Sequence, residues 1–196
     1  MQKNISLLFL IVTASVIQIF GSGCAYKLSS QTITLPGNVK SVQIPLFRND
    51  SSEVDAETSF TNALKTEAIR SKAVMVKNDA ENAEAVLQGR IVSIDVVADE
   101  SVVEAKNTTY LPTETVLATQ YRVNVKVELV LKKRSTNEKI WSGNFIQAQN
   151  FSAAQITLPV INTANSLYNE SAKRQTLNAL SKVMMQAAFD RMVENF

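Results

Sequence analysis

A regular alternation of apolar and polar residues over 121–131 is the strongest pattern in the chain. Side chains of a β-strand point to opposite faces in turn, so a period of two predicts a strand with one buried and one solvent-facing side. The apolar positions are Tyr121, Val123, Val125, Val127, Leu129 and Leu131, and the polar positions between them are Arg122, Asn124, Lys126 and Glu128. The polar stretch 133–139 and the segment 140–147 after it predict a β-hairpin, with Trp141, Gly143 and Phe145 on one face of the returning strand.

Three further segments, 39–47, 73–76 and 85–98, contain the apolar and β-branched residues typical of strands. Pro45 predicts that the first of them lies at a sheet edge or ends near that residue, because proline lacks the N–H that a sheet ladder needs. Gly89 is a candidate β-bulge in the third. Polar turns are expected at two places, 48–52 and 78–83.

Helical spacing of apolar residues predicts two α-helices. The first begins after Ser52, whose hydroxyl is a candidate N-cap, and runs to about Arg70, while the second covers 166–195. Their apolar positions are Ala56, Phe60, Ala63, Leu64 and Ala68 in the first, and Leu177, Leu180, Met184, Ala188 and Met192 in the second. The order strand, helix, strands, helix predicts an α+β fold, with a small mixed or antiparallel sheet of about four strands and two helices packed on one face.

Residues 1–23 differ from the rest of the chain. Lys3 precedes the largely apolar run 5–20, which is short for a membrane-spanning helix, and small residues follow it. This three-part layout is typical of a secretory signal peptide. Small residues directly before Cys24 resemble the bacterial lipobox, whose cysteine receives diacylglycerol and becomes the mature N-terminus, although Gly21 stands where that motif usually has Leu.

We therefore expect a lipoprotein signal peptide at 1–23 and a single α+β periplasmic domain at 24–196, anchored by lipidated Cys24. The alternative is an ordinary signal peptide, or an uncleaved anchor, beside an incidental cysteine. Ala25 is not the Asp that retains enterobacterial lipoproteins at the inner membrane, so by resemblance it favours the outer membrane.

Composition narrows the chemistry that the chain can perform. The 196 residues include no His and one Cys, which excludes a Ser-His-Asp triad, a His-ligated zinc site and an internal disulfide. The 20 Lys and Arg nearly balance the 18 Asp and Glu, whereas a dedicated nucleic-acid binder normally carries a strong basic excess. Carboxylates remain for catalysis, but no paired-acid motif is present, and the acids Asp79, Glu81 and Glu84 do not have the spacing of a calcium loop. We predict no catalytic residue, metal or cofactor.

Seven segments follow one another in a recognisable order: Cys24–Leu28, Leu35-Pro36, Val42–Asn49, Ala83–Ile91, the strand 121–131, Lys139–Trp141 and Ala187-Ala188. In order and in spacing they resemble the lipopolysaccharide-assembly lipoproteins of the LptE type. Position 25 departs from the usual Gly of the opening. The resemblance implies a small sheet carrying two helices and a non-catalytic role. It also implies a plug inside a large outer-membrane β-barrel, which the protein helps to fold and through which lipopolysaccharide reaches the outer leaflet.

Two groups of residues are candidates for contact with these partners. The phosphates of lipid A need Lys or Arg, and the candidate phosphate contacts are Lys132, Lys133, Arg134, Lys139, Lys173 and Arg174. The candidate partner surface comprises the polar side of the alternating strand and the centre of the long polar segment 99–119, namely Arg122, Asn124, Lys126, Tyr110 and Leu111. Ordinary solvated turns and strand faces are the alternative interpretation of both groups.

A second functional class fits the same signals. A cysteine directly after a signal peptide, and a similar order of strands and helices, also occur in envelope lipoproteins that activate a cell-wall synthase or form a secretion-pore ring. Copurification with a synthase, or a stable ring of identical copies, would favour that class.

Overall fold

The alternating segment forms the centre of a mixed sheet, as its period predicts. The computed structural model describes residues 34–99, 102–104, 116–118, 120–152 and 166–194. The strands are β1 (Ser41–Gln43), β2 (Arg48–Asn49), β3 (Met75–Lys77), β4 (Ala85–Ala98), β5 (Val102–Glu104), β6 (Val116–Ala118), β7 (Gln120–Lys133) and β8 (Lys139–Ser152). The helices are α2 (Ala56–Ser71) and α3 (Ser166–Glu194), with short 3₁₀ turns η1 (Pro36–Asn38) and η2 (Ala80–Asn82).

Six strands form the main sheet, in the order β3-β1-β4-β7-β8 with β2 also paired to β4. The pairs around β1 and β2 are parallel, and the long pairs β4–β7 and β7–β8 are antiparallel. The prediction of an α+β fold with a mixed sheet is confirmed, whereas the expected count of about four strands is too low. Strands of two or three residues, such as β2, are too short to show a period of their own.

Pro45 ends the first strand, as predicted, because β1 stops at Gln43. The polar segment after it is not only a turn. Arg48 and Asn49 pair in parallel with Arg90 and Ile91 of β4, so the expectation of a plain turn at 48–52 is wrong. Backbone pairing with a neighbouring strand, which the polar composition does not reveal, decides this segment.

Gly89 is not the position of a β-bulge. The register of β4 against β7 shifts between Ile91 and Ser93 instead. Gly89 is required for another reason, because a Cβ atom there would lie 2.3 Å from Cζ of the Phe47 ring. The glycine therefore accommodates an aromatic side chain that lies across the strand.

Both predicted helices form, and their apolar positions face the core. All five apolar positions expected to line α3 are buried, as are Ala56, Phe60, Leu64 and Ala68 of α2. The start of α2 differs from the prediction, because Asp55 occupies the N-cap in a left-handed conformation with φ 65° and no side-chain hydrogen bond caps the helix there. Ser52 is therefore not the cap.

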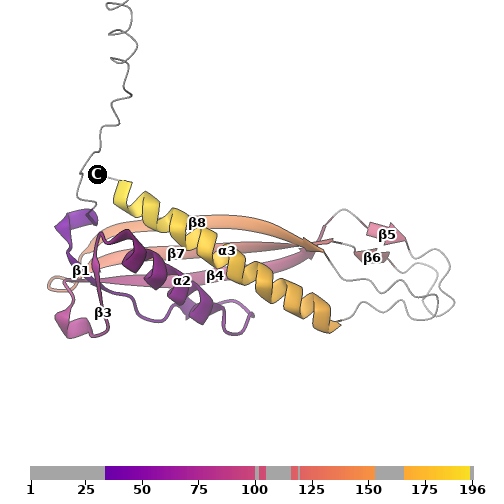
Figure 1. Ribbon diagram of the computed structural model, residues 1–196, viewed down its shortest axis with the longest axis horizontal. Helices are drawn as coiled ribbons and strands as arrows, with labels where there is room; N and C mark the ends of the chain where they lie inside the picture. The colour runs from indigo at the N-terminus through magenta and orange to yellow at the C-terminus, as the bar shows by residue number, and fades with distance from the viewer. Residues whose placement is uncertain (1–33, 100–101, 105–115, 119, 153–165, 195–196) are drawn as a thin grey trace, which may run out of the picture. The chain divides into compact units, whose positions relative to one another are not determined.

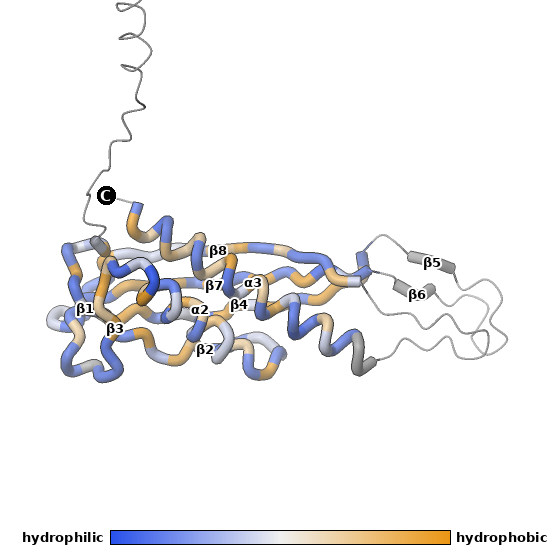
Figure 2. Tube along the Cα trace, in the orientation of Figure 1, coloured by the Kyte–Doolittle hydropathy of each residue, from blue (hydrophilic) through white to orange (hydrophobic). Residues whose placement is uncertain are grey.

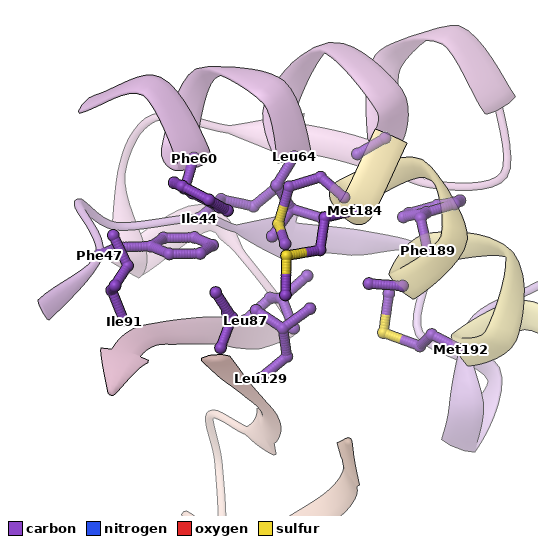
Figure 3. Packing of buried hydrophobic residues seen from close by; sticks show 14 of the residues in the cluster. Ile44, Phe47, Phe60, Leu64, Leu87, Ile91, Leu129, Met184, Phe189 and Met192 are labelled. Carbon is purple, nitrogen blue, oxygen red and sulfur yellow. The ribbon is translucent and has the colours of Figure 1, made fainter. Parts of the chain in front are cut away.

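The two helices pack side by side on one face of the sheet (Figure 1). Side chains of α2, α3, β4 and β7 meet between the layers, and Figure 3 shows Phe47 and Phe60 beside Leu87 and Ile91. The opposite face of the sheet carries no helix among the described residues. We call it the open face, and it positions most of the candidate site.

The long polar segment 99–119 is more ordered than its composition suggests, since β5 and β6 form an antiparallel pair within it. Its expected centre, with Tyr110 and Leu111, lies outside the described residues, as does Cys24. Within the described part of the chain, no helix has the length and apolar character needed to cross a membrane.

Candidate functional site

The open face displays the polar side of β7 together with its neighbours on β4 and β8. Arg122 lies between Val97 and Asn150, Asn124 between Asp95 and Ala148, and Lys126 between Ser93 and Ile146. Because directly paired residues of antiparallel strands share a face, the three predicted partner-surface residues of β7 stand in one row. Arg122 is exposed, and Asn124 and Lys126 are half-buried.

One end of this row is fixed by a polar cluster that joins β7 and β8 to Asp99, the residue directly after β4. Nη2 of Arg122 donates to Oδ1 of Asp99 at 3.2 Å, and Nε donates to Oδ1 of Asn150 at 3.1 Å. The amide of Asn150 in turn donates to Oδ2 of Asp99 at 2.7 Å. Arg122 is thus held in place by its own sheet, which leaves its exposed edge as a preorganised contact rather than a mobile charge.

A second cluster on the open face was not predicted from the sequence. The carboxylate of Asp50 accepts from Nε of Arg48 at 2.7 Å and from Nε of Arg90. Arg90 also lies 3.6 Å from Oε2 of Glu128 on β7. The hydrogen bond from Arg48, followed by that from Arg90, lowers the pKa of Asp50 below its ordinary range. Two arginines and two carboxylates balance here, so the cluster adds polarity without net charge.

A shallow hollow of about 440 Å³ opens beside this second cluster. Its apolar wall includes Pro45, Val130 and Leu46, and the Leu46 side chain is 62% exposed. Its polar wall comes from the arginines of the cluster and Glu128. The sequence indicated this hollow only through the polar alternation on β4 and β7. That alternation does not reveal that the segment after Pro45 returns to the sheet.

The turn between β7 and β8 gathers four of the predicted phosphate contacts. Lys133, Arg134 and Lys139 are exposed and Lys132 is half-buried. The turn is held by its backbone, with the N–H of Lys133 donating to the carbonyl of Glu138 at 2.8 Å and that of Arg134 to the carbonyl of Glu84 at 2.9 Å. We call these four residues the hairpin-tip cluster.

The charges of the hairpin-tip cluster are available to a ligand. Among the described residues, none of its four cations forms an ion pair within 4.0 Å, although the Arg134 guanidinium also donates to the carbonyl of Glu81. A hollow of about 540 Å³ lies against the cluster and is bordered by Gly37, Glu84 and Ser135. Unpaired cations beside an open hollow fit an anionic group.

Lys173 and Arg174 do not join this cluster. They lie in the first half of α3, which begins at the end of the domain opposite the β7–β8 turn (Figure 1). Nζ of Lys173 lies 2.9 Å from carboxylate oxygens of both Glu53 and Glu170, and Arg174 lies 3.2 Å from Glu170. The hydrogen bonds from Lys173 and then from Arg174 lower the pKa of Glu170. Lys173 is therefore a bridge between α3 and the segment before α2.

Lys173→Met is expected to lower the free energy of unfolding by about 1–2 kcal/mol at pH 7, because it leaves two carboxylates without their shared cation. Burial alone would lower the pKa of Lys173, but the hydrogen bonds to Glu53 and Glu170 outweigh it and raise the pKa above its ordinary value of 10.5. The stabilisation is therefore complete below that value and is lost as the pH rises through the raised pKa. Urea unfolding at a series of pH values measures this.

Arg174→Met is the matched control, because the Arg174 side chain is 68% exposed and shares Glu170. Its cost should stay within about 0.5 kcal/mol. The bridging role would be contradicted if both variants lowered the free energy of unfolding equally. It would also be contradicted if the loss caused by Lys173→Met stayed the same as the pH rose above 10.5.

Comparison with known protein families identifies the chain. The model of the LptE family, described as lipopolysaccharide-assembly, matches residues 39–195. The chain belongs to the LptE family. This confirms the resemblance drawn from the sequence over nearly all of the α+β domain. The match does not include Cys24 or the segment before it, so the signal peptide and the lipid anchor of this LptE-family protein stay predictions.

Solved structures similar to this LptE-family chain share little sequence with it. A neuraminyllactose-binding hemagglutinin homolog from Helicobacter pylori is 15% identical over 83% of this chain and 89% of its own, with a TM-score of 0.49. The PelC dodecamer from Paraburkholderia phytofirmans is 15% identical over 79% and 86%, with a TM-score of 0.45. The rare lipoprotein B from Shewanella oneidensis is 16% identical over 78% and 91%, with a TM-score of 0.36. No curated protein matches significantly.

Proposed function

We propose that this LptE-family protein is a non-catalytic outer-membrane lipoprotein that plugs and stabilises the β-barrel of lipopolysaccharide export. The family match over residues 39–195 carries the proposal. In it, lipidated Cys24 holds the domain to the outer membrane, facing the periplasm or the barrel lumen, and the domain assists lipopolysaccharide assembly at the outer leaflet. Its partners are the large barrel, lipopolysaccharide and the membrane.

The open face supports a polar, shape-based contact with the barrel. Most of its charges are paired with each other, as in the cluster of Arg48, Asp50, Arg90 and Glu128, so docking against a polar wall would leave few charges unpaired. Lys126 stands between the two clusters without an ion pair among the described residues, and with Arg122 and Asn124 it forms the proposed contact row. Tyr110 and Leu111 extend this proposal to the segment between β5 and β6.

The hairpin-tip cluster supports a contact with lipopolysaccharide phosphates. Reversing Lys132, Lys133 and Arg134 to Glu is expected to weaken lipopolysaccharide binding at least tenfold, about 1.4 kcal/mol, because repulsion replaces charge-assisted hydrogen bonds. The thermal midpoint should change little, since these side chains form no ion pair with another described residue and the variant removes only the exposed hydrogen bond from Arg134 to the carbonyl of Glu81. Binding is measured with purified lipopolysaccharide at two salt concentrations.

The control is an equal change of net charge on the helical face. Lys65 lies on α2, Lys72 directly after it and Lys182 on α3, the layer that covers one face of the sheet, and all three become Glu in the control. The control should bind lipopolysaccharide almost as well as the unchanged protein. If the two triple variants bind equally, the hairpin-tip cluster does not contact phosphate.

The role as a plug is tested by affinity purification of the full chain from mildly solubilised envelopes, followed by mass spectrometry. A large β-barrel protein in stoichiometric amount is the expected result. A cell-wall synthase without any barrel would favour the other lipoprotein class and contradict the plug. A ring of identical copies without a barrel would do the same.

A further inference from the structure

The outer edge of β8 is long and unpaired in the described part of the chain. β8 has 14 residues and is the last strand of the sheet, bonded only to β7. Figure 1 shows it along one margin of the sheet, with α3 crossing one face. The opposite margin is β3, which has only three residues. One edge of this sheet is therefore too short to recruit a strand, and the other is long enough to do so.

The β8 edge also lacks the features by which proteins usually protect such edges. Exposed edges are commonly blocked by charged side chains, prolines or bulges. From Ile140 to Ser152 the strand contains no charged residue and no proline. Its one register irregularity lies at the very start, opposite Leu131 and Lys132. The 3₁₀ turn η1 packs against the start of the strand, beside Ile140. Beyond it, the backbone N–H and C=O groups that point away from β7 pair with no other described strand and can receive one.

On the helix side of β8, α3 packs over Phe145 in the first half of the strand, whereas Phe151 near its end is buried against Tyr121 of β7. On the helix side, Phe145 is half-buried beneath the guanidinium of Arg191 from α3, which lies 5.9 Å from the ring centre. Further along the same side Gln149 is exposed, and Figure 2 shows that hydrophilic residues dominate this second half of β8. On the open face, Ile146 projects at the middle of the strand with 76% of its surface exposed.

We infer that two copies of this chain pair along β8, antiparallel and around a two-fold axis at Ile146. In this register each Ile146 stands beside Ile146 of the second copy on the open face. On the helix side Trp141 stands beside Phe151 of the second copy, and Phe145 beside Gln147. This inference does not depend on the proposed function, because it rests only on the strand and its side chains.

Pairing of two β8 strands brings no like charges together, keeps the two α3 helices apart and covers an exposed hydrophobic side chain. No like charges meet between Ile140 and Ser152, because that stretch carries none. The half of β8 that packs under Arg191 of α3 lies beside the other half of β8 in the second copy, so the two α3 helices occupy different halves of the joint sheet. The most exposed hydrophobic side chain of the sheet, Ile146, loses contact with water. A two-fold contact of this kind closes as a dimer and does not grow into a ring.

The size of the contact predicts a weak dimer. Stable interfaces typically use about 20–30 residues from each partner, and the pairing provides only the residues of one strand. We therefore expect dimers that form and dissociate with protein concentration, rather than an obligate assembly.

Cysteine cross-linking tests the register. The full chain carries Cys24→Ser, so that an introduced cysteine is the only one, and is oxidised under mild conditions in detergent. Ile146→Cys should form a disulfide-linked dimer, because the two Cβ atoms lie about 4.5–5.5 Å apart when residues are directly opposite. Asn144→Cys and Ala148→Cys should each fail alone, because four residues of offset separate each from its own copy by about 14 Å. A mixture of these two variants should cross-link, since residues 144 and 148 face each other.

Light scattering supplies a second measurement that does not need a disulfide. The mass of the unmodified chain should rise with concentration towards twice the monomer mass, and Ile146→Lys should stay monomeric because two ammonium groups would meet at the axis. Residue 146 is exposed in one copy, so the variant is expected to fold. Cross-linking at all three positions alike, or a constant monomer mass, would overturn the inference. Both outcomes leave the barrel test unaffected.

Discussion

Phe60→Ala is expected to lower the free energy of unfolding by about 3–5 kcal/mol, the range for removing a buried phenylalanine. Phe60 has no exposed surface and points from α2 into the layer between helix and sheet (Figure 3). Its neighbours Ile44 and Phe47 come from the segment around Pro45, which lies between the short strands β1 and β2 and belongs to neither. The truncation therefore removes apolar contacts and leaves a cavity that the long antiparallel strands cannot close.

Denaturant unfolding measures the loss as a shift of the midpoint with an unchanged slope. Ile69→Ala is the matched control, because Ile69 lies on the same helix but is 63% exposed. It should change stability by no more than about 0.5 kcal/mol. If the two variants lower the free energy of unfolding by similar amounts, Phe60 is not part of the buried core.

Gly89→Ala is expected to destabilise the domain by about 1–3 kcal/mol, although alanine in a strand normally costs less than glycine. The added Cβ would lie 2.3 Å from Cζ of Phe47. That ring is 3% exposed, and the N–H of Phe47 donates to Oγ1 of Thr61 at 3.0 Å, which ties the segment to α2. The aromatic side chain has no free space into which it could retreat.

A double-mutant cycle with Phe47→Leu isolates this contact. Leucine is smaller than the ring, so Gly89→Ala should cost less in that background, with a coupling of about 0.5–3 kcal/mol. Gln88→Ala, at the neighbouring exposed position of β4, serves as the control and should show no coupling to Phe47. A neutral or stabilising Gly89→Ala in the unchanged protein would show that the ring lies elsewhere.

These two sites differ in how far the sequence predicted them. Phe60 is identifiable from helical spacing alone, because apolar residues three and four apart share a helix face. The role of Gly89 is not, since it depends on Phe47, which arrives from 42 residues earlier and beyond a proline. The sequence suggested a bulge at Gly89, whereas the strand is regular there and shifts register after Ile91.

The candidate site divides in the same way. The row Arg122, Asn124 and Lys126 follows from alternation and lies on the open face as expected. Lys173 and Arg174 looked equivalent to the hairpin-tip cations in sequence. The structure shows them paired with Glu53 and Glu170, and charge pairing between distant segments has no local pattern.

The sequence by itself determined where the long strands and both helices lie, the α+β class and the family. Periods of two and 3.6 residues are local properties of the chain, and the family segments recur in order along it. The tertiary structure alone decided the register shift in β4, the return of Arg48 and Asn49 to the sheet, the ion pairs that remove some cations from solvent, and the open edge of β8. Each of these depends on which distant residues meet, because pairing and burial are set by packing between elements and not by the composition of any one of them.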